Sequence, residues 1–140
     1  MPDGYLTAGL KYSYTFFAME VTISGIDAHR GLDLFEGDVE AYVDILRSYV
    51  RNTPVVLGKM RTVSEETLRD YAAAVHGLKS VSDSIGAETA RKNAKQLEDL
   101  AKGGDLAGIL VIHDSFIKYV DKLVENIQIW LEKYDSLNNE

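Results

Sequence analysis

The stretch SEETLRDYAAAVHGLKSVSDSIG, residues 64–86, decides the fold class of this chain. Ser64 is a suitable N-cap, and Glu65 and Glu66 suit the positive end of a helix. The residues that follow alternate in steps of three and four, the spacing of one buried helical stripe: Leu68, Tyr71, Val75, Leu78, Ser82 and Ile85. Gly86 marks the end of the helix. The stretch therefore predicts an amphipathic helix that packs against other helices.

Three further segments show the same spacing. Asp38 is predicted to cap a long helix, in which Pro54 either produces a kink or begins a new helix. A second helix follows Gly86 and ends at Gly103 and Gly104. Asp105 is predicted to cap a third helix, the longest of all. The expected inner positions are Val39, Tyr42, Leu46, Tyr49, Thr53, Val56 and Met60 in the first; Ala90, Ala94, Leu97 and Ala101 in the second; and Leu106, Leu110, His113, Ile117, Val120, Val124, Ile127, Leu131 and Tyr134 in the third.

Four long amphipathic helices with short polar turns predict an all-α fold, an antiparallel up-and-down four-helix bundle. Asp27 is expected to cap a short helix that runs through Phe35 and forms a lid over one end of the bundle. Residues 1–25 are rich in aromatic and β-branched side chains, which favours an extended or irregular N-terminal arm or a linker. We therefore divide the chain into residues 1–25, the bundle of residues 26–136 and a C-terminal tail of residues 137–140.

The composition excludes several classes of function. The chain has 140 residues and no cysteine, which rules out disulfides, thiolate metal sites and cysteine catalysis. Its net charge of −7 disfavours binding to nucleic acid or to anionic membranes. No apolar run approaches the roughly 20 residues of a membrane span, and the first residues do not read as a signal peptide. We expect a cytoplasmic protein with no nucleic-acid or membrane partner.

The candidate chemistry lies on one flank of the predicted helix of residues 64–86. His76, Lys79, Ser80 and Asp83 share a face beside the buried stripe, and Gly77 keeps that face low. A neutral imidazole is a good nitrogen nucleophile at pH 7, and a lysine one turn away would balance the charge of a phosphoryl group. One histidine and one lysine on a helix also occur by chance, so the spacing alone leaves a plain surface pair open.

Residues 75–88, VHGLKSVSDSIGAE, resemble the signature of the histidine-containing phosphotransfer (HPt) domain family: His, any residue, Leu, Lys, small residues and then Gly-Ala. Residues 25–50, GIDAHRGLDLFEGDVEAYVDILRSYV, and residues 96–106, QLEDLAKGGDL, are similar to other segments of that family. The resemblance extends from about Ile26 to Tyr134. One position departs from it, because the family usually has Gly where this chain has Ser80.

The resemblance implies a phosphocarrier of a two-component phosphorelay. His76 would accept a phosphoryl group from a receiver-domain aspartate and pass it on, with Lys79 as charge partner. Glu98 would hydrogen-bond the other ring nitrogen, and Lys102 would add positive charge to a receiver docking face that includes Gly77, Ser80 and Asp83. The partners would be response-regulator receiver domains and, in some arrangements, a hybrid histidine kinase. A monomer would suffice, and we expect no cofactor or metal on this chain, with Mg²⁺ on the receiver alone.

No nucleotide-binding loop is present in the sequence, so we expect a carrier domain with a phosphohistidine intermediate and not an enzyme that uses ATP. Two alternatives stay open. The same bundle, unphosphorylated, would serve as an adaptor that docks a receiver or kinase. In the second alternative, the bundle has a purely structural role: it holds a partner helix and forms a stable oligomer. The other two histidines are interpreted as structural: His29 as a surface residue and His113 as a hydrogen-bonded core residue.

Overall fold

The computed structural model describes residues 22–138, and every structural statement below refers to them. The elements in chain order are α2 (Ala28–Leu34), α3 (Val39–Met60), the 3₁₀ helix η2 (Glu65–Thr67), α4 (Leu68–Ser84), α5 (Glu88–Lys102) and α6 (Leu106–Asn138). No strand occurs in this part of the chain. The predicted all-α class is confirmed. Most of the expected N-terminal arm, residues 1–21, lies outside the described residues.

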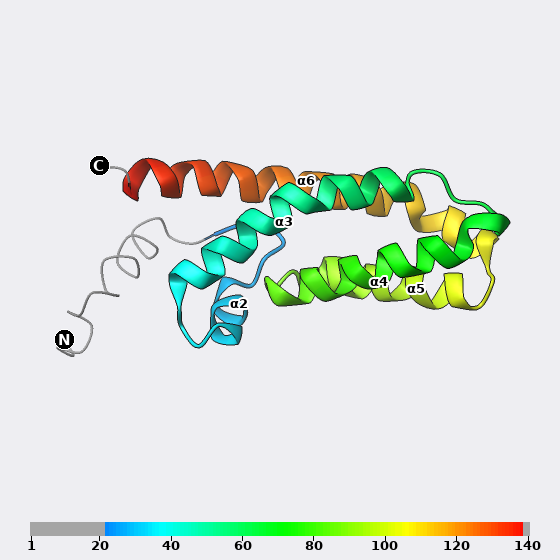
Figure 1. The fold of residues 1–140 in the computed structure, drawn as a ribbon, viewed down its shortest axis with the longest axis horizontal. Helices are drawn as coiled ribbons and strands as arrows, with labels where there is room; N and C mark the ends of the chain where they lie inside the picture. The colour runs from blue at the N-terminus through cyan, green and yellow to red at the C-terminus, as the bar shows by residue number, and fades with distance from the viewer. Residues whose placement is uncertain (1–21, 139–140) are drawn as a thin grey trace.

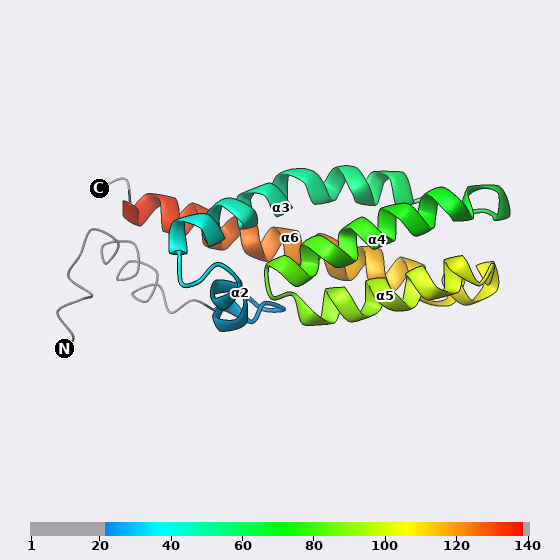
Figure 2. The same ribbon diagram turned by 60° about the horizontal axis from the view of Figure 1, so that its bottom comes forward.

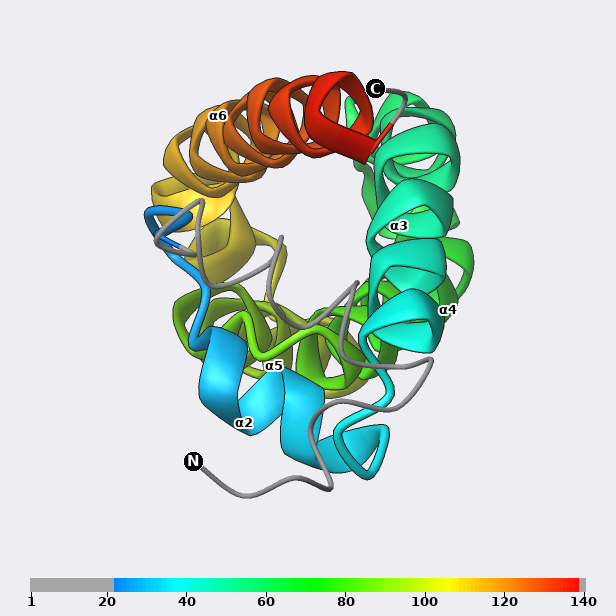
Figure 3. The ribbon, with the colours of Figure 1, turned by 90° about the vertical axis from the view of Figure 1, so that its left-hand side faces the viewer.

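The four long helices run alternately in opposite directions along one axis (Figures 1 and 2). Seen end on, they form a ring in which α3 packs on α4, α4 on α5, α5 on α6 and α6 on α3 (Figure 3). This is the predicted antiparallel up-and-down four-helix bundle. Helix α6 is the longest and extends beyond the turn between α4 and α5 (Figure 1). It reaches Asn138, so it includes the first two residues of the segment 137–140 that we assigned to a tail.

Aspartate side chains cap the helices where the sequence predicts them. The Oδ1 atom of Asp27 accepts a hydrogen bond from Arg30 N at 3.0 Å, and Asp38 Oδ1 accepts one from Ala41 N, also at 3.0 Å. Asp105 Oδ1 accepts one from Gly108 N at 2.8 Å. Each cap satisfies a backbone N–H group that has no partner within its helix, which explains why the starts of these helices can be read from sequence.

Ser64 caps the short 3₁₀ helix η2, which leads directly into α4. Ser64 and Thr67 form a capping box, in which the backbone N–H of Ser64 donates to Thr67 Oγ1 at 2.8 Å. At the other end of α4 the chain reverses at Gly86, whose φ of +81° is a conformation that residues with a Cβ rarely adopt. These two ends fix the length and direction of α4.

The core lies inside the ring of helices. Of the predicted stripe of α4, Leu68 is partly buried and the other five residues are buried: Tyr71, Val75, Leu78, Ser82 and Ile85. In α6 the prediction is wrong at Leu110, which is exposed, while Ile109 is fully buried. Because α6 packs on both α3 and α5, its buried band is wider than one stripe and holds the adjacent pair Phe116 and Ile117. Leu110 falls just beyond the edge of that band.

Helix α3 continues without a break through Pro54, so the alternative in which Pro54 begins a new helix is wrong. Pro54 lies on the exposed side of α3, between buried Thr53 and the partly buried Val56. The lost backbone hydrogen bond therefore lies on the solvent side, where water can replace it. No helix of the described residues is long and apolar enough to cross a membrane.

The short helix α2 lies against the turn between α4 and α5 (Figure 3). The backbone N–H of Asp27 donates to the carbonyl of Gly86 at 2.9 Å, and the hydroxyl of Tyr42 donates to the carbonyl of Ile85 at 2.9 Å. A Cβ atom placed on Gly31 would lie 2.5 Å from the Tyr42 ring, so only glycine allows α2 this close to α3. Helix α2 thus covers the end of the bundle at which α4 stops.

Candidate functional site

His76 lies in the middle of α4, and its side chain is 58% exposed. The residue before it, Val75, is fully buried in the core stripe. Since successive helical residues are about 100° apart, the imidazole is directed to the flank of α4 and toward α5. The bundle thus holds the backbone of His76 rigidly while the ring remains accessible from outside.

Glu98 on α5 is the centre of the polar contacts around His76. Its side chain is only 2% exposed, and it accepts hydrogen bonds from three donors on two helices. His76 Nδ1 lies 2.6 Å from Glu98 Oε2, and Lys79 Nζ lies 2.6 Å from Oε1. Lys102 Nζ lies 3.1 Å from Oε2. A buried carboxylate is stable only with such partners, and here the two lysines and the imidazole provide them.

These contacts lower the pKa of Glu98 to about 2. The hydrogen bond from Lys79 is the largest cause; burial acts in the opposite direction, and the hydrogen bonds from Lys102 and His76 lower the pKa further. Glu98 is therefore ionised at neutral pH and can only accept hydrogen bonds. It follows that Nδ1 of His76 carries a proton, so that in the neutral ring the lone pair is on Nε2. Among the described residues Nε2 has no hydrogen-bond partner.

An open groove of about 610 Å³ lies in front of the ring, between α4 and α5. Its lining combines small side chains with two cations and the Glu98 carboxylate: Leu68, Arg69, Ala72, Ala73, His76, Glu98, Ala101 and Lys102. The alanines leave space beside the imidazole for another molecule. Lys79 does not line this groove, although its ammonium group contacts Glu98.

Gly77 and Ser80 are both exposed near His76, and these small residues leave the surface around the ring accessible. A Cβ atom placed on Gly77 would meet no atom within 4 Å, so the fold itself does not require glycine there. The hydroxyl of Ser80 donates to the backbone carbonyl of His76 at 3.2 Å, one turn earlier in the helix. Gly77 also borders a second groove between α3 and α4 with apolar walls, among them Ile45, Val56 and Val81.

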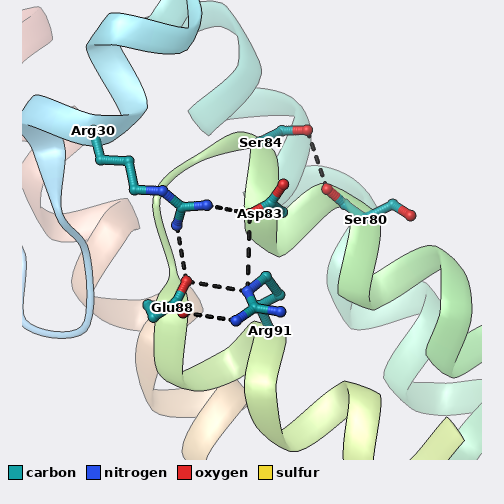
Figure 4. A network of polar contacts seen from close by, with 6 residues as sticks. All are labelled: Arg30, Ser80, Asp83, Ser84, Glu88 and Arg91. Atoms are coloured by element: carbon teal, nitrogen blue, oxygen red, sulfur yellow. Dashed lines mark hydrogen bonds and ion pairs between the residues drawn. The ribbon is translucent and has the colours of Figure 1, made fainter.

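Asp83 is two turns from His76 and belongs to a different cluster, shown in Figure 4. Its Oδ1 atom lies 2.6 Å from Arg30 Nη2 of α2 and 3.9 Å from Arg91 Nε of α5. Glu88 contacts the same two arginines, at 2.8 Å and 2.7 Å. This ion-pair cluster connects α2 to the ends of α4 and α5. Asp83 therefore shares a face of α4 with His76, as expected, but its carboxylate is directed to the lid helix α2 and not to the histidine.

The two remaining histidines lie apart from His76. His113 of α6 is buried, and its Nδ1 atom lies 2.9 Å from the hydroxyl of Tyr71, as predicted for a core histidine. His29 is exposed on α2. Within residues 22–138 no cluster of three or more His, Cys, Asp or Glu side chains is placed to hold a metal ion.

The family resemblance pairs Glu98 with His76, but the sequence analysis misses that this carboxylate is buried and that it binds both lysines. It also misses Arg69 as part of the groove. The signal for Glu98 is present in its spacing, because Glu98 directly follows the inner residue Leu97 and precedes Lys102 by four positions. Arg69 lies seven residues before His76, two helical turns away on the same face.

The comparison with protein families agrees with this geometry. The model of the Hpt domain family matches residues 30–135, which is most of the chain. The chain belongs to the Hpt domain family. Hpt domains have a phosphotransfer role in two-component phosphorelays, in which they interact with receiver domains and kinases, and they are phosphocarriers rather than true enzymes. No curated protein and no solved structure matches the chain in the other two comparisons.

Proposed function

We propose that this Hpt domain is a phosphocarrier in which His76 accepts a phosphoryl group from the aspartate of a receiver domain and passes it to another. One observation carries the proposal: an exposed imidazole whose Nδ1 is bonded to a buried, ionised carboxylate, and whose Nε2 has no hydrogen-bond partner in the described residues. Glu98 thereby selects the tautomer with a nucleophilic Nε2.

In the transfer step the Nε2 lone pair attacks the phosphorus of the aspartyl phosphate. The bond from Nε2 to phosphorus forms, the bond from phosphorus to the aspartate oxygen breaks, and the receiver's carboxylate leaves with the electron pair. No proton moves, because Nδ1 keeps its hydrogen bonded to Glu98. Glu98 then stabilises the positive charge that the ring carries after phosphorylation. Transfer to the next aspartate is the reverse of this step.

The bundle contributes a positioned nucleophile and positive charge. Phosphoryl transfer depends mainly on alignment and on neutralisation of charge, and Lys79 and Lys102 bring two cations to the site. The Mg²⁺ ion would be bound by the receiver, and this chain would need no cofactor. A monomer with an exposed His76 suffices for docking in the cytoplasm through the face that Gly77, Ser80 and the groove provide.

The experiment is incubation with a phosphorylated receiver domain, followed by intact-mass measurement. We expect a gain of one phosphoryl group that is labile in acid and stable in base, and no gain in the His76→Gln variant. His29→Gln, a change of another exposed histidine, is the matched control and should be phosphorylated like the wild type. His76→Gln should keep its melting temperature and its affinity for the receiver, because the ring lies outside the core.

The adaptor alternative makes the opposite forecast. It requires binding to the receiver without any phosphorylation of the wild-type chain, and equal signalling output from His76→Gln and the wild type. Either result would overturn the carrier proposal.

A further inference from the structure

The two lysines at Glu98 occupy different positions. Lys79 is 25% exposed, and its Nζ atom contacts Oε1 at 2.6 Å. Lys102 is 64% exposed, and its Nζ atom contacts Oε2 at the longer distance of 3.1 Å. Lys79 is therefore the more tightly held cation, and Lys102 the one with more freedom to move.

The oxygen that Lys102 contacts is also the oxygen that accepts from His76. His76 Nδ1 lies 2.6 Å from Oε2, so Lys102 is on the histidine side of the carboxylate and Lys79 on the other side. The groove in front of the ring confirms this arrangement, because Lys102 lines it and Lys79 does not. His76 and Lys102 line the same groove, so a phosphoryl group accepted by the exposed ring would lie in the groove that contains Lys102.

The free-energy cost of releasing each lysine also differs. If Lys79 left Glu98, a carboxylate that is 2% exposed would lose its shortest contact to a cation, and a buried charge without a partner is costly. If Lys102 left, Glu98 would still be bonded to Lys79 and His76. Arg69 of α4 also lines the groove, so its guanidinium group adds positive charge there.

We propose that Lys102 is the residue that contacts the phosphoryl group on His76, while Lys79 is a positioning residue that acts through Glu98. This inference rests on the proposed carrier function and divides between two residues the role that the family resemblance gives to Lys79 alone. On phosphorylation, the ammonium group of Lys102 moves from Oε2 to the phosphoryl oxygens, and Lys79 remains on Oε1. The bond from Nε2 to phosphorus stays intact during this movement.

The test compares Lys102→Met, Lys79→Met and a matched control, Lys95→Met. Lys95 is an exposed lysine of the same helix, and it also contacts a carboxylate four residues away, Asp99 at 3.0 Å. Two quantities are measured for each variant: the rate of phosphorylation by a phosphorylated receiver and the rate of hydrolysis of the phosphohistidine. The melting temperature and the ¹⁵N NMR shifts of the His76 ring, which report the tautomer, are recorded in parallel.

We expect Lys102→Met to slow phosphorylation about tenfold, the loss of one charge-assisted contact, and to change the hydrolysis rate, with the tautomer unchanged. Lys102→Arg should restore most of the rate. Lys79→Met should shift the ring toward a mixture of tautomers, because Glu98 loses its strongest partner. Lys95→Met should behave like the wild type in all four measurements.

Two results would overturn the inference: a wild-type phosphorylation rate in Lys102→Met, or a large loss of rate in Lys79→Met with the tautomer unchanged. Failure of the carrier proposal would be recognised separately, because the wild-type chain itself would then remain unphosphorylated while it binds the receiver.

Discussion

At the scale of single residues, the site depends on the buried negative charge of Glu98, which accepts hydrogen bonds from several donors. Glu98 is 2% exposed and accepts from three donors, whereas His76 beside it is 58% exposed. The buried residue holds the exposed one in place and fixes its tautomer. The imidazole can therefore remain open to a partner without losing its orientation, which is the property that the proposed carrier function requires.

Gly77 gives a prediction at the same scale. Glycine inside a helix costs about 1 kcal/mol relative to alanine, and the space around Gly77 would accommodate a Cβ. Gly77→Ala should therefore increase the free energy of unfolding by about 1 kcal/mol, as measured by urea denaturation. It should also slow transfer from the receiver, because the added methyl group stands beside His76 on the docking face.

The control is Gly58→Ala. Gly58 of α3 is likewise inside a helix with open space around its Cβ position, so this variant should gain the same stability. It lies far from His76 along the chain and on another helix, and transfer should be unchanged. Equal transfer rates in the two variants would remove Gly77 from the docking face.

At the scale of elements, α2 is held to the bundle by close backbone packing at one site and by ion pairs at another. Gly31 provides the packing, and the cluster of Arg30, Asp83, Glu88 and Arg91 provides the ion pairs (Figure 4). The side chains of Arg30, Asp83 and Glu88 are 40–45% exposed, and ion pairs that solvent can reach contribute little to stability. The contact at Gly31 should therefore dominate the attachment of α2.

Gly31→Ala tests this conclusion. The new Cβ would lie 2.5 Å from the Tyr42 ring and 2.8 Å from the backbone carbonyl of Ile85, so α2 has to move away. We expect a loss of roughly 1–3 kcal/mol in the free energy of unfolding, the usual cost of overpacking, and faster hydrogen exchange in residues 28–34. Arg30→Met should have a smaller effect on both. A larger effect from Arg30→Met would show that the ion pairs hold the lid.

The elements also show which parts of the fold can be predicted from sequence. Helix starts depend on local hydrogen bonds, and Asp27, Asp38 and Asp105 are found where the sequence predicts caps. Leu110 is predicted incorrectly because the width of the buried band on α6 depends on two neighbouring helices. The family resemblance pairs Glu98 with His76, but the burial of Glu98 and its contact with Lys79 depend on the close packing of α4 and α5.

At the scale of the whole molecule, ionised carboxylates connect separate parts of the bundle. Glu98 joins α5 to α4, Glu88 joins α5 to α2, and Asp135 joins α6 to Arg47 of α3 at 2.5 Å. Hydrogen bonds from Lys79, Arg91 and Arg47, respectively, are the largest causes that lower the pKa of these three groups. Because all three are lowered, the folded state binds protons less readily than the unfolded chain does.

The sign of the pH dependence follows from these shifts. For Glu98 and Glu88 the pKa falls from 4.5 to about 2, so their contribution to stability is complete above pH 4.5 and is lost as the pH falls toward 2. Glu98→Gln lacks the carboxylate at every pH. Its free energy of unfolding should therefore be lower than that of the wild type at pH 7, and the difference should shrink as the pH falls from 4.5 to 2. Urea denaturation at a series of pH values measures this difference directly.

High salt distinguishes the contribution of Glu88 from that of Glu98, because salt screens the exposed pairs of Glu88 more than the buried contacts of Glu98. A difference between wild type and Glu98→Gln that stays constant from pH 7 to 2 would mean that folding does not lower the pKa of Glu98, and that its contacts with Lys79, Lys102 and His76 do not stabilise its charge.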